Sequence, residues 1–380
     1  MKSIKKQRGF SLIELLVAMS ITIIVLAGVT MGFTRAMGSI QYAFSRTETQ
    51  ANARAAVNDI ARDLTQASSG GVPFGGPGLT AGNVPLFAHD VNGTDYLAAN
   101  TFTQPVLNPV TPAFGDGIAI PSVLGGANSD GIVILYEDQR VDNFPGYNWP
   151  NAACPQPAGG CLTFDAAGDT VTMPAGTTPA MNDPTVGLQV GDLVLFTNAN
   201  GSLVEEVTNV VGPTIFNIAN GDALQMNGGV QQQLGNFDNT VNPPAFTGYP
   251  PTKMYKLAMV SYYIAGIDAN GNIVPGGGAG TVDYRLMRQV NGLPPVPVAE
   301  HIVNLKFTYD LADQTTGVQI ANVPNAAPPP AAVPLYNEIW NVYVTVTARS
   351  PRTDPKGNYT YATLFTSVAP RNLSFNDRYK

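Results

Sequence analysis

The chain has 380 residues, of which only 12% are charged, and it contains 39 glycines and 31 prolines. A chain of this length forms one large or two modest domains, and the composition favours a loop-rich, β-leaning fold over a helical bundle. The formal net charge is −7, and this acidic balance argues against nucleic-acid binding, which needs basic patches.

The N-terminus combines a basic leader with a long apolar run. The leader, residues 1–9, carries Lys2, Lys5, Lys6 and Arg8. From Phe10 to Phe33 the sequence has 24 residues and a single charge, Glu14. As a helix this run is about 36 Å long, which is enough to cross a bilayer. We expect the basic flank to stay in the cytoplasm and everything after Phe33 to face outward.

Two other membrane-directed segments share part of this pattern. A secretory signal peptide has a shorter apolar core with small residues after it, whereas Ala27 and Gly28 lie inside this run. Neither a signal peptide nor an ordinary anchor has a use for Glu14. Insertion remains favourable, since the thirteen Leu, Ile, Val and Phe residues contribute about 4–8 kcal/mol against about 3 kcal/mol for one acid. A buried carboxylate of this kind needs a cation within reach.

The basic leader, Gly9, Phe10, Glu14 and the apolar helix resemble the N-terminus of type IV prepilins and type II secretion pseudopilins. The resemblance implies that a prepilin peptidase cuts between Gly9 and Phe10 and methylates the amine of Phe10. It also implies that Glu14 pairs with that amine on a neighbouring subunit during docking. Other major and minor pilins and an inner-membrane assembly platform would be the partners, with no cofactor and no metal.

The helix is predicted to continue over 34–67 as an amphipathic segment. A stripe of apolar residues at spacings of three and four consists of Ala53, Val57, Ile60, Ala61 and Leu64. Such a stripe needs a sheet to cover it, and the run from Ser68 to Pro73 should end the helix. The helical charges balance, so that without the four positive charges of the leader the whole net charge of −11 belongs to the outer part, 68–380.

Gly28 and Gly32 form a G-x-x-x-G pattern in the apolar half. Small residues at this spacing allow close helix packing, and they would equally be a place where the helix loosens on assembly. Glycine is also simply frequent in transmembrane helices. These three interpretations stay open at this point.

The first part of the outer region, 70–250, is interpreted as a variable, β-rich insertion. Residues 132–136 are predicted to form a buried strand, and 215–218 a further strand. Asn200-Gly201 lies between the apolar runs 192–196 and 203–207, which indicates a hairpin. On the oxidising exported side, Cys154 and Cys161 are expected to form a disulfide worth about 2.5 kcal/mol. The alternative, a zinc site, has an unsuitable cysteine spacing.

The second part, 254–380, is more regular. Strands are predicted at 254–267 and 282–289, with a plain turn at 268–272, which lacks the residues of an EF-hand loop. Alternating apolar residues predict two more strands, over 303–309 and 340–346, each with one buried face. The expected fold is therefore α+β and type IV pilin-like, a long helix packed on an antiparallel β head with a β-rich insertion.

A weaker resemblance covers 255–375. The segments 284–288, 299–302, 307–310, 344–349 and 370–372, together with Asp63 near the helix end, are similar to PilW-type minor pilins and J-type pseudopilins. For Arg371, an assembly contact and a surface ion pair are both open.

The sequence contains no G-x-S-x-G, H-E-x-x-H or P-loop pattern, and we expect no enzyme. The carboxylates of Glu137 with Asp142, or of Asp310 with Asp313, are of a kind common on β surfaces. His301 is interpreted as a strand-end residue. The resemblance implies a structural minor pilin, first in the inner membrane and then in a pilus. A tip adhesin acting through 70–250 and a secretion pseudopilin are the alternatives.

Overall fold

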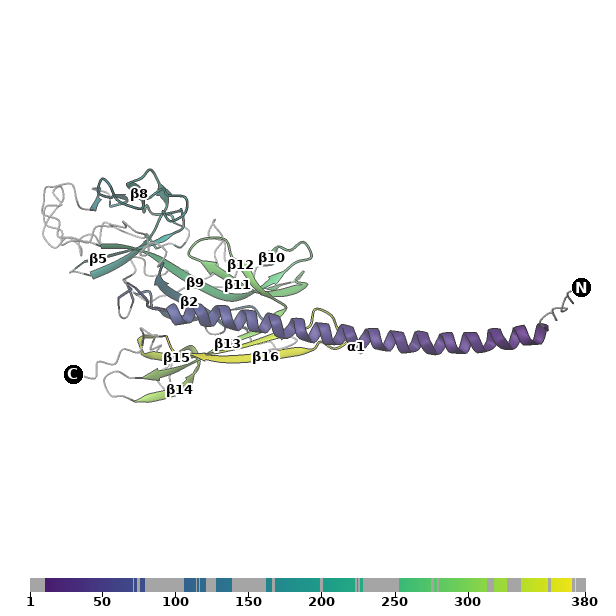
Figure 1. Cartoon of the computed structure of the whole chain (residues 1–380). Helices are drawn as coiled ribbons and strands as arrows, with labels where there is room; N and C mark the ends of the chain where they lie inside the picture. The colour runs from purple at the N-terminus through teal and green to yellow at the C-terminus, as the bar shows by residue number, and fades with distance from the viewer. Residues whose placement is uncertain are drawn as a thin grey trace, which may run out of the picture.

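The structure is a computed structural model of the chain. It describes residues 11–70, 72–73, 76–78, 106–113, 115, 117–120, 128–138, 162–165, 168–198, 201–222, 224, 226–227, 253–274, 277–278, 280–312, 318–326, 336–354, 357–370 and 373. A single long helix, α1 (Leu12–Gln66), projects from a β-rich head (Figure 1). Gly9, Phe10, Cys154 and Cys161, which carry the predicted cleavage, methylation and disulfide, lie outside the described residues.

Local signals set both ends of α1. At the start, Ser11 Oγ accepts a hydrogen bond from Glu14 N–H, and Ser11 N–H donates to the Glu14 carboxylate, a complete capping box. At the end, Ala67 N–H still bonds to Leu64 O, and Ser68 then takes a φ of 60°. The predicted range of 10–67 therefore agrees with the observed helix within the usual variation of helix ends.

The larger sheet is organised around the long strand β9 (Lys253–Ile267). Its main order is β1 (Val110–Ala113), β2 (Gly131–Glu137), β9, β11 (Asp283–Val290) and β12 (Val296–Glu300). The hairpin of β5 (Leu193–Asn198) and β6 (Gly201–Glu206) joins through β5, and β10 (Ile273–Val274) also pairs with β9. The pairings between these strands are antiparallel. Because β9 pairs with β2 and β5 as well as with β11, residues before and after 250 share one sheet.

A second sheet has the order β14 (Gln319–Val323), β13 (Ile302–Ala312), β15 (Ile339–Arg349) and β16 (Tyr361–Val368). Two short 3-10 helices, Pro324–Ala326 and Tyr336–Glu338, flank the connection between β14 and β15. A small third sheet consists of β3 (Thr163–Phe164), β4 (Thr170–Thr172), β8 (Ile215–Asn217) and β7 (Asn209–Val210). It shares a second apolar core with β5, β6 and β9 of the larger sheet, in which Phe164 meets Phe196 of β5 edge to face with ring centroids 5.1 Å apart.

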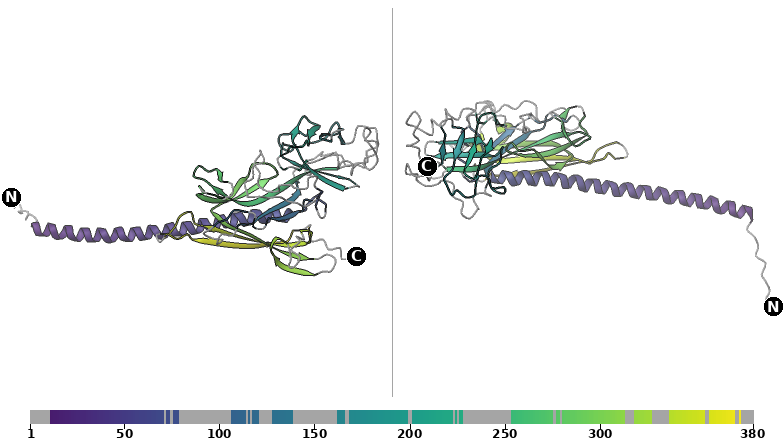
Figure 2. Two further views of the ribbon diagram at one scale, coloured as in Figure 1. Left: turned by 180° about the vertical axis from the view of Figure 1, so that it is seen from behind. Right: turned by 90° about the horizontal axis from the view of Figure 1, so that it is seen from above.

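The second half of α1 lies between the two large sheets. It packs against β15 and β16 on one side and against β12 and β2 on the other (Figures 1 and 2). The predicted stripe is the buried face, since Ala53, Val57, Ile60 and Leu64 all enter the main core. Burying a Val, Ile or Leu side chain contributes about 1.5–3 kcal/mol each. The expectation that a sheet covers the stripe is confirmed, with the difference that two sheets cover it, one from each side.

The strands predicted at 132–136, 192–196, 203–207, 215–218, 254–267, 282–289, 303–309 and 340–346 are all present. The turn after β9 is closed by Asp268, whose carboxylate accepts bonds from Asn270 N–H and from the backbone and side chain of Asn272. Strands β1, β12, β14 and β16, which lie at the ends of the main strand orders of the two large sheets, were not predicted.

Candidate functional site

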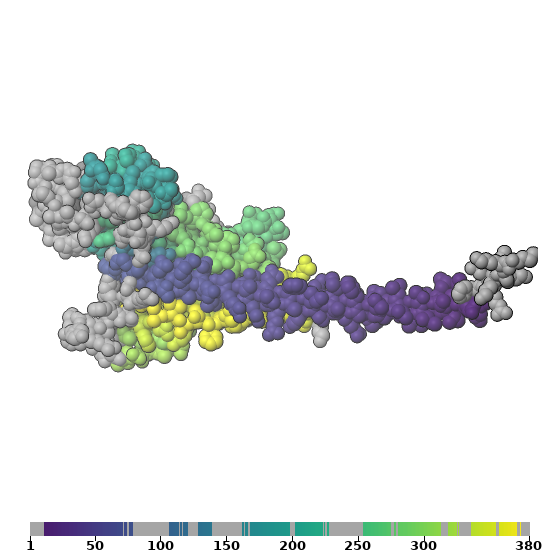
Figure 3. Space-filling view, viewed as in Figure 1, coloured from purple at the N-terminus to yellow at the C-terminus, as the bar shows by residue number. Residues whose placement is uncertain are grey.

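The first half of α1 is apolar and fully exposed. Figure 3 shows it projecting beyond the head without cover from any described residue, and the exposed fraction of Ile24 is 71%. Among the described residues, α1 is the one helix long and apolar enough to cross a membrane. Its hydroxyl groups are satisfied internally, because Ser20, Thr22 and Thr30 each donate to the carbonyl four residues earlier. This surface suits a lipid bilayer, where unpaired polar groups are costly.

Glu14 lies in the first turn of this helix. Its Oε2 accepts from Ser11 N–H at 3.0 Å, and the side chain is otherwise open to solvent. A carboxylate here also meets the positive end of the helix dipole. Glu14 is therefore held at the end of the helix, next to the position where the peptidase-generated amine of Phe10 is expected.

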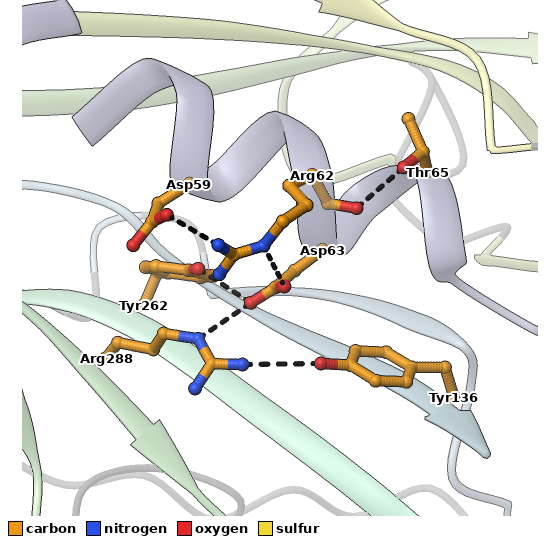
Figure 4. Close-up of polar contacts among 7 residues, drawn as sticks. All are labelled: Asp59, Arg62, Asp63, Thr65, Tyr136, Tyr262 and Arg288. Carbon is orange, nitrogen blue, oxygen red and sulfur yellow. Dashed lines mark hydrogen bonds and ion pairs between the residues drawn. The ribbon is translucent and has the colours of Figure 1, made fainter. Parts of the chain in front are cut away.

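The other end of α1 is fastened to the head by a buried acid. Asp63 is 1% exposed, and its Oδ2 accepts from Tyr262 Oη at 2.7 Å and from Arg288 Nε at 2.8 Å. Arg62 Nε lies 3.4 Å from Oδ1, and Arg288 also donates to Tyr136 Oη at 3.3 Å (Figure 4). The partners come from β9, β11 and β2, three neighbouring strands of the larger sheet.

The electrostatics of this cluster follow from burial around one negative charge. Burial, and then the charge of Asp63, raise the pKa of Tyr262 well above its ordinary value. Burial likewise raises the pKa of Tyr136 to about 12. Burial opposes the charge of Arg288, but the hydrogen bond and the charge of Asp63 outweigh it and raise its pKa. Both tyrosines therefore stay neutral, Tyr262 as a donor to Asp63 and Tyr136 as an acceptor from Arg288, and Arg288 stays charged.

The backbone after α1 adds to this attachment. Ser68 N–H donates to Leu135 O, and Glu137 N–H donates to Ser69 O, so the helix exit extends the edge of β2. Gly70 has a φ of 75°, and a Cβ at this position would collide with the side chain of Glu137. The end of the helix is thereby held in one register against the larger sheet, by backbone and side chains together.

A second polar junction joins the two large sheets at the end of the head nearer the N-terminus. His301, in the turn between β12 and β13, has its Nδ1 2.7 Å from Asp283 Oδ1 on β11. Arg349 of β15 places an NH2 nitrogen 3.9 Å from the same carboxylate, and its guanidinium lies over the rings of Tyr284 and Tyr359 at 5.5 and 4.6 Å. The strand-end interpretation of His301 holds, but its ion pair was not predicted.

The pKa values at this junction shift in opposite directions. The hydrogen bond to Asp283 raises the pKa of His301 above its ordinary value of 6.5, although burial opposes this. Burial alone would raise the pKa of Asp283, but the hydrogen bond from His301 and its charge lower it below 3.8. Arg349, Arg285 and Glu300 are the other charges facing the pair.

This junction predicts a pH dependence of stability. Because the pKa of His301 is raised in the folded state, its contribution to the free energy of unfolding is complete below pH 6.5. This contribution is lost as the pH rises through the folded-state pKa. The contribution of Asp283 is complete above pH 3.8 and lost as the pH falls through its lowered pKa. We therefore expect the free energy of urea unfolding of the full chain to fall between pH about 6 and about 8. His301→Asn should flatten this fall, since Asn tolerates the observed φ of 58°.

His89→Asn is the matched control, because the chain has only two histidines. It should keep the pH dependence of the natural chain. An unchanged slope in His301→Asn would contradict the assignment of the pH dependence to this junction.

The candidate carboxylates that the structure describes, Asp310 and Glu137, are both placed within the β head. Asp310 is occupied within its own sheet, where it accepts from Asn322 N–H and from Tyr343 Oη. Glu137 is buried beside the helix exit, while Asp142, Asp313, His89 and Arg371 lie outside the described residues. Within the described ranges, no group of three His, Cys, Asp or Glu side chains is placed to hold a metal ion.

The comparisons agree with the N-terminal part of this picture. Residues 4–30 match the family described as the prokaryotic N-terminal methylation motif. Comparison with curated proteins and with solved structures gave no match. The motif implies processing by prepilin peptidase within a pilus or secretion machinery, and its family is typically structural. The chain thus carries the methylation motif typical of type IV prepilins and pseudopilins, on a long apolar helix that is packed against an antiparallel β head.

Proposed function

We propose that the chain is a minor pilin, a structural subunit that helps to prime or cap a type IV pilus. The observation that carries this proposal is the combination of the methylation motif over 4–30 with an uncovered apolar helix that is anchored by Asp63 in a large β head. The size of the head favours a minor subunit, since major pilins are usually much shorter. The similarity of 255–375 to PilW-type minor pilins supports the same assignment.

Each part of the N-terminus has a role in this proposal. Cleavage after Gly9 frees Phe10, whose methylated amine pairs with Glu14 of an adjacent subunit. The helix up to Phe33 anchors the subunit in the inner membrane before assembly and enters the filament afterwards. Cys154 and Cys161 form a disulfide in the exported head. The partners are other pilins, the prepilin peptidase and the assembly platform.

The test is deletion of the gene in its native host, followed by electron microscopy of surface pili. We expect pili to be lost or strongly reduced and to return on complementation. Normal pili, together with a defect in protein secretion, would contradict the pilus assignment in favour of a secretion pseudopilin.

One observation favours a second candidate, a subunit that binds a surface at the pilus tip. The small sheet of β3, β4, β7 and β8 packs on a second core, apart from the main one, and lies at the end of the head remote from the N-terminus (Figure 1). In this case, deletion would leave pili in normal number but reduce attachment, and removing the small sheet would reproduce that defect.

A further inference from the structure

A polar groove runs between α1 and the first residues of β16. Its volume is about 200 Å³, and its helix side is formed by Arg46, Gln50 and Arg54, with Thr49 at the floor. The opposite side is formed by Tyr361 and Thr363. The three helix residues follow a spacing of four, so they share one face, and the two arginines are about 12 Å apart along the axis. The groove therefore presents two cations and several neutral hydrogen-bonding groups.

Neither arginine has an acidic partner among the residues that the structure describes. Within the described part of the chain, no ion pair joins Arg46 or Arg54 to a carboxylate, and both side chains are exposed. Two other arginines that contact the larger sheet or its helix are paired, Arg62 with Asp59 and Arg288 with Asp63. Two exposed guanidinium groups lining one groove leave ten N–H donors for an external acceptor.

The other charges of α1 also favour an acidic partner for the two arginines. Asp59 and Asp63 are already paired within the subunit, and Glu14 lies at the N-terminus of the helix. The remaining acid of α1, Glu48, is outnumbered by three exposed arginines, Arg35, Arg46 and Arg54. The exposed face of α1 between the membrane and the head is thereby left with more positive than negative charge. The head, in contrast, carries a formal net charge of −11. A head with this excess of acidic residues can supply carboxylates, whereas the groove is lined by two arginines and no acidic residue.

The distance from the membrane argues against a lipid headgroup as the occupant. Arg46 is 13 residues beyond Phe33, the end of the apolar run, and thus about 20 Å farther along a straight helix. Arg54 is about 32 Å beyond the same point. The headgroup layer extends only about 5–8 Å past the hydrocarbon core. Lipid phosphate therefore cannot reach the groove while Phe33 marks the membrane boundary.

We propose that this groove receives an acidic segment of a neighbouring pilin subunit, whose carboxylates bind Arg46 and Arg54. This inference rests on the proposed function as a filament subunit. Guanidinium groups bind carboxylates through two parallel hydrogen bonds, which fixes orientation as well as proximity. The contact would set the rotation of one head relative to the next, at a level of the helix beyond the membrane-derived part of the filament.

The direct test converts both arginines to lysine. The variant R46K/R54K keeps the charges and provides primary amines, which a zero-length carbodiimide couples to carboxylates in contact. Sheared filaments that contain the variant should yield peptides in which Lys replaces Arg46 or Arg54 and is joined to an Asp or Glu of another subunit. Filaments that contain the variant but give no such cross-link would overturn the proposal.

Charge reversal is the second test. R46E/R54E should reach the membrane in normal amount and with natural protease resistance, but its amount in sheared filaments should fall at least tenfold. The matched control is R352E, because Arg352 is also exposed and without an ion pair among the described residues, but lies in a neighbouring groove. Normal incorporation of R46E/R54E, or an equal loss in both variants, would overturn the proposal. Absence of the natural chain from filaments would instead contradict the proposed function itself.

Discussion

Replacing Asp63 with Ala is expected to destabilise the head by about 3 kcal/mol, near the lower end of the range for breaking a buried ion pair. The variant leaves the guanidinium of Arg288 and the hydroxyl of Tyr262 without their shared acceptor. The lower end applies because the side chain of Arg288 is 24% exposed, so water can compensate in part. Urea unfolding of the full chain in detergent measures the change.

Asp59→Ala is the matched control for this prediction. Asp59 lies one helical turn earlier and pairs with an exposed Arg62, and such pairs contribute about 0–1 kcal/mol. Combining Asp63→Leu with Arg288→Met should recover much of the loss, because both charges then leave the interior together. Equal effects of Asp63→Ala and Asp59→Ala would show that the buried cluster does not hold the helix.

The second large effect is expected at Glu14. Glu14→Ala should leave cleavage after Gly9 intact, but it should reduce the amount of the subunit in sheared filaments at least tenfold. The physical reason is that the amine of Phe10 on the neighbouring subunit would be buried without a counter-charge, which costs several kcal/mol. Immunoblots of sheared filaments and membranes measure incorporation and cleavage from the same cells.

Glu14→Gln separates docking from helix capping. The amide oxygen can still accept the bond from Ser11 N–H, so the capping box, worth about 1 kcal/mol, is retained. Glutamine nevertheless lacks the charge that pairs with an ammonium group. If docking is the role of Glu14, Gln should fail as Ala does, whereas normal incorporation of Glu14→Gln would limit Glu14 to capping.

The helix and most central strands could be predicted because their signals are local. Ser11 and Glu14 form the capping box within four residues, and the run from Ser68 to Pro73 ends the helix where it was expected to end. Buried strands such as β2 contain an uninterrupted apolar run, which in β2 covers 132–136. These patterns lie within a window of the sequence and need no knowledge of the partners.

The edges and junctions could not be predicted, because their causes lie far away in the chain. Strand β16 contains small and polar residues, and its Phe365 is 82% exposed. Its sequence therefore shows no clear alternation of buried apolar and exposed polar residues. The partners of Asp63 are 199 and 225 residues away. The polar groove likewise lies between a face of α1 and a strand more than 300 residues later in the chain. No local pattern marks any of these contacts.

The packing of α1 against β16 brings the first element of the chain onto its last strand. The ribosome makes α1 first, and under the proposed function its apolar half is held in the membrane while the rest of the chain is exported. Contacts this distant in sequence form slowly, since a long loop must close before they are gained. Under the proposed function, the buried stripe around Ile60 would stay open on one side until β16 has been exported. Completion of export would then determine when the subunit is ready to leave the bilayer.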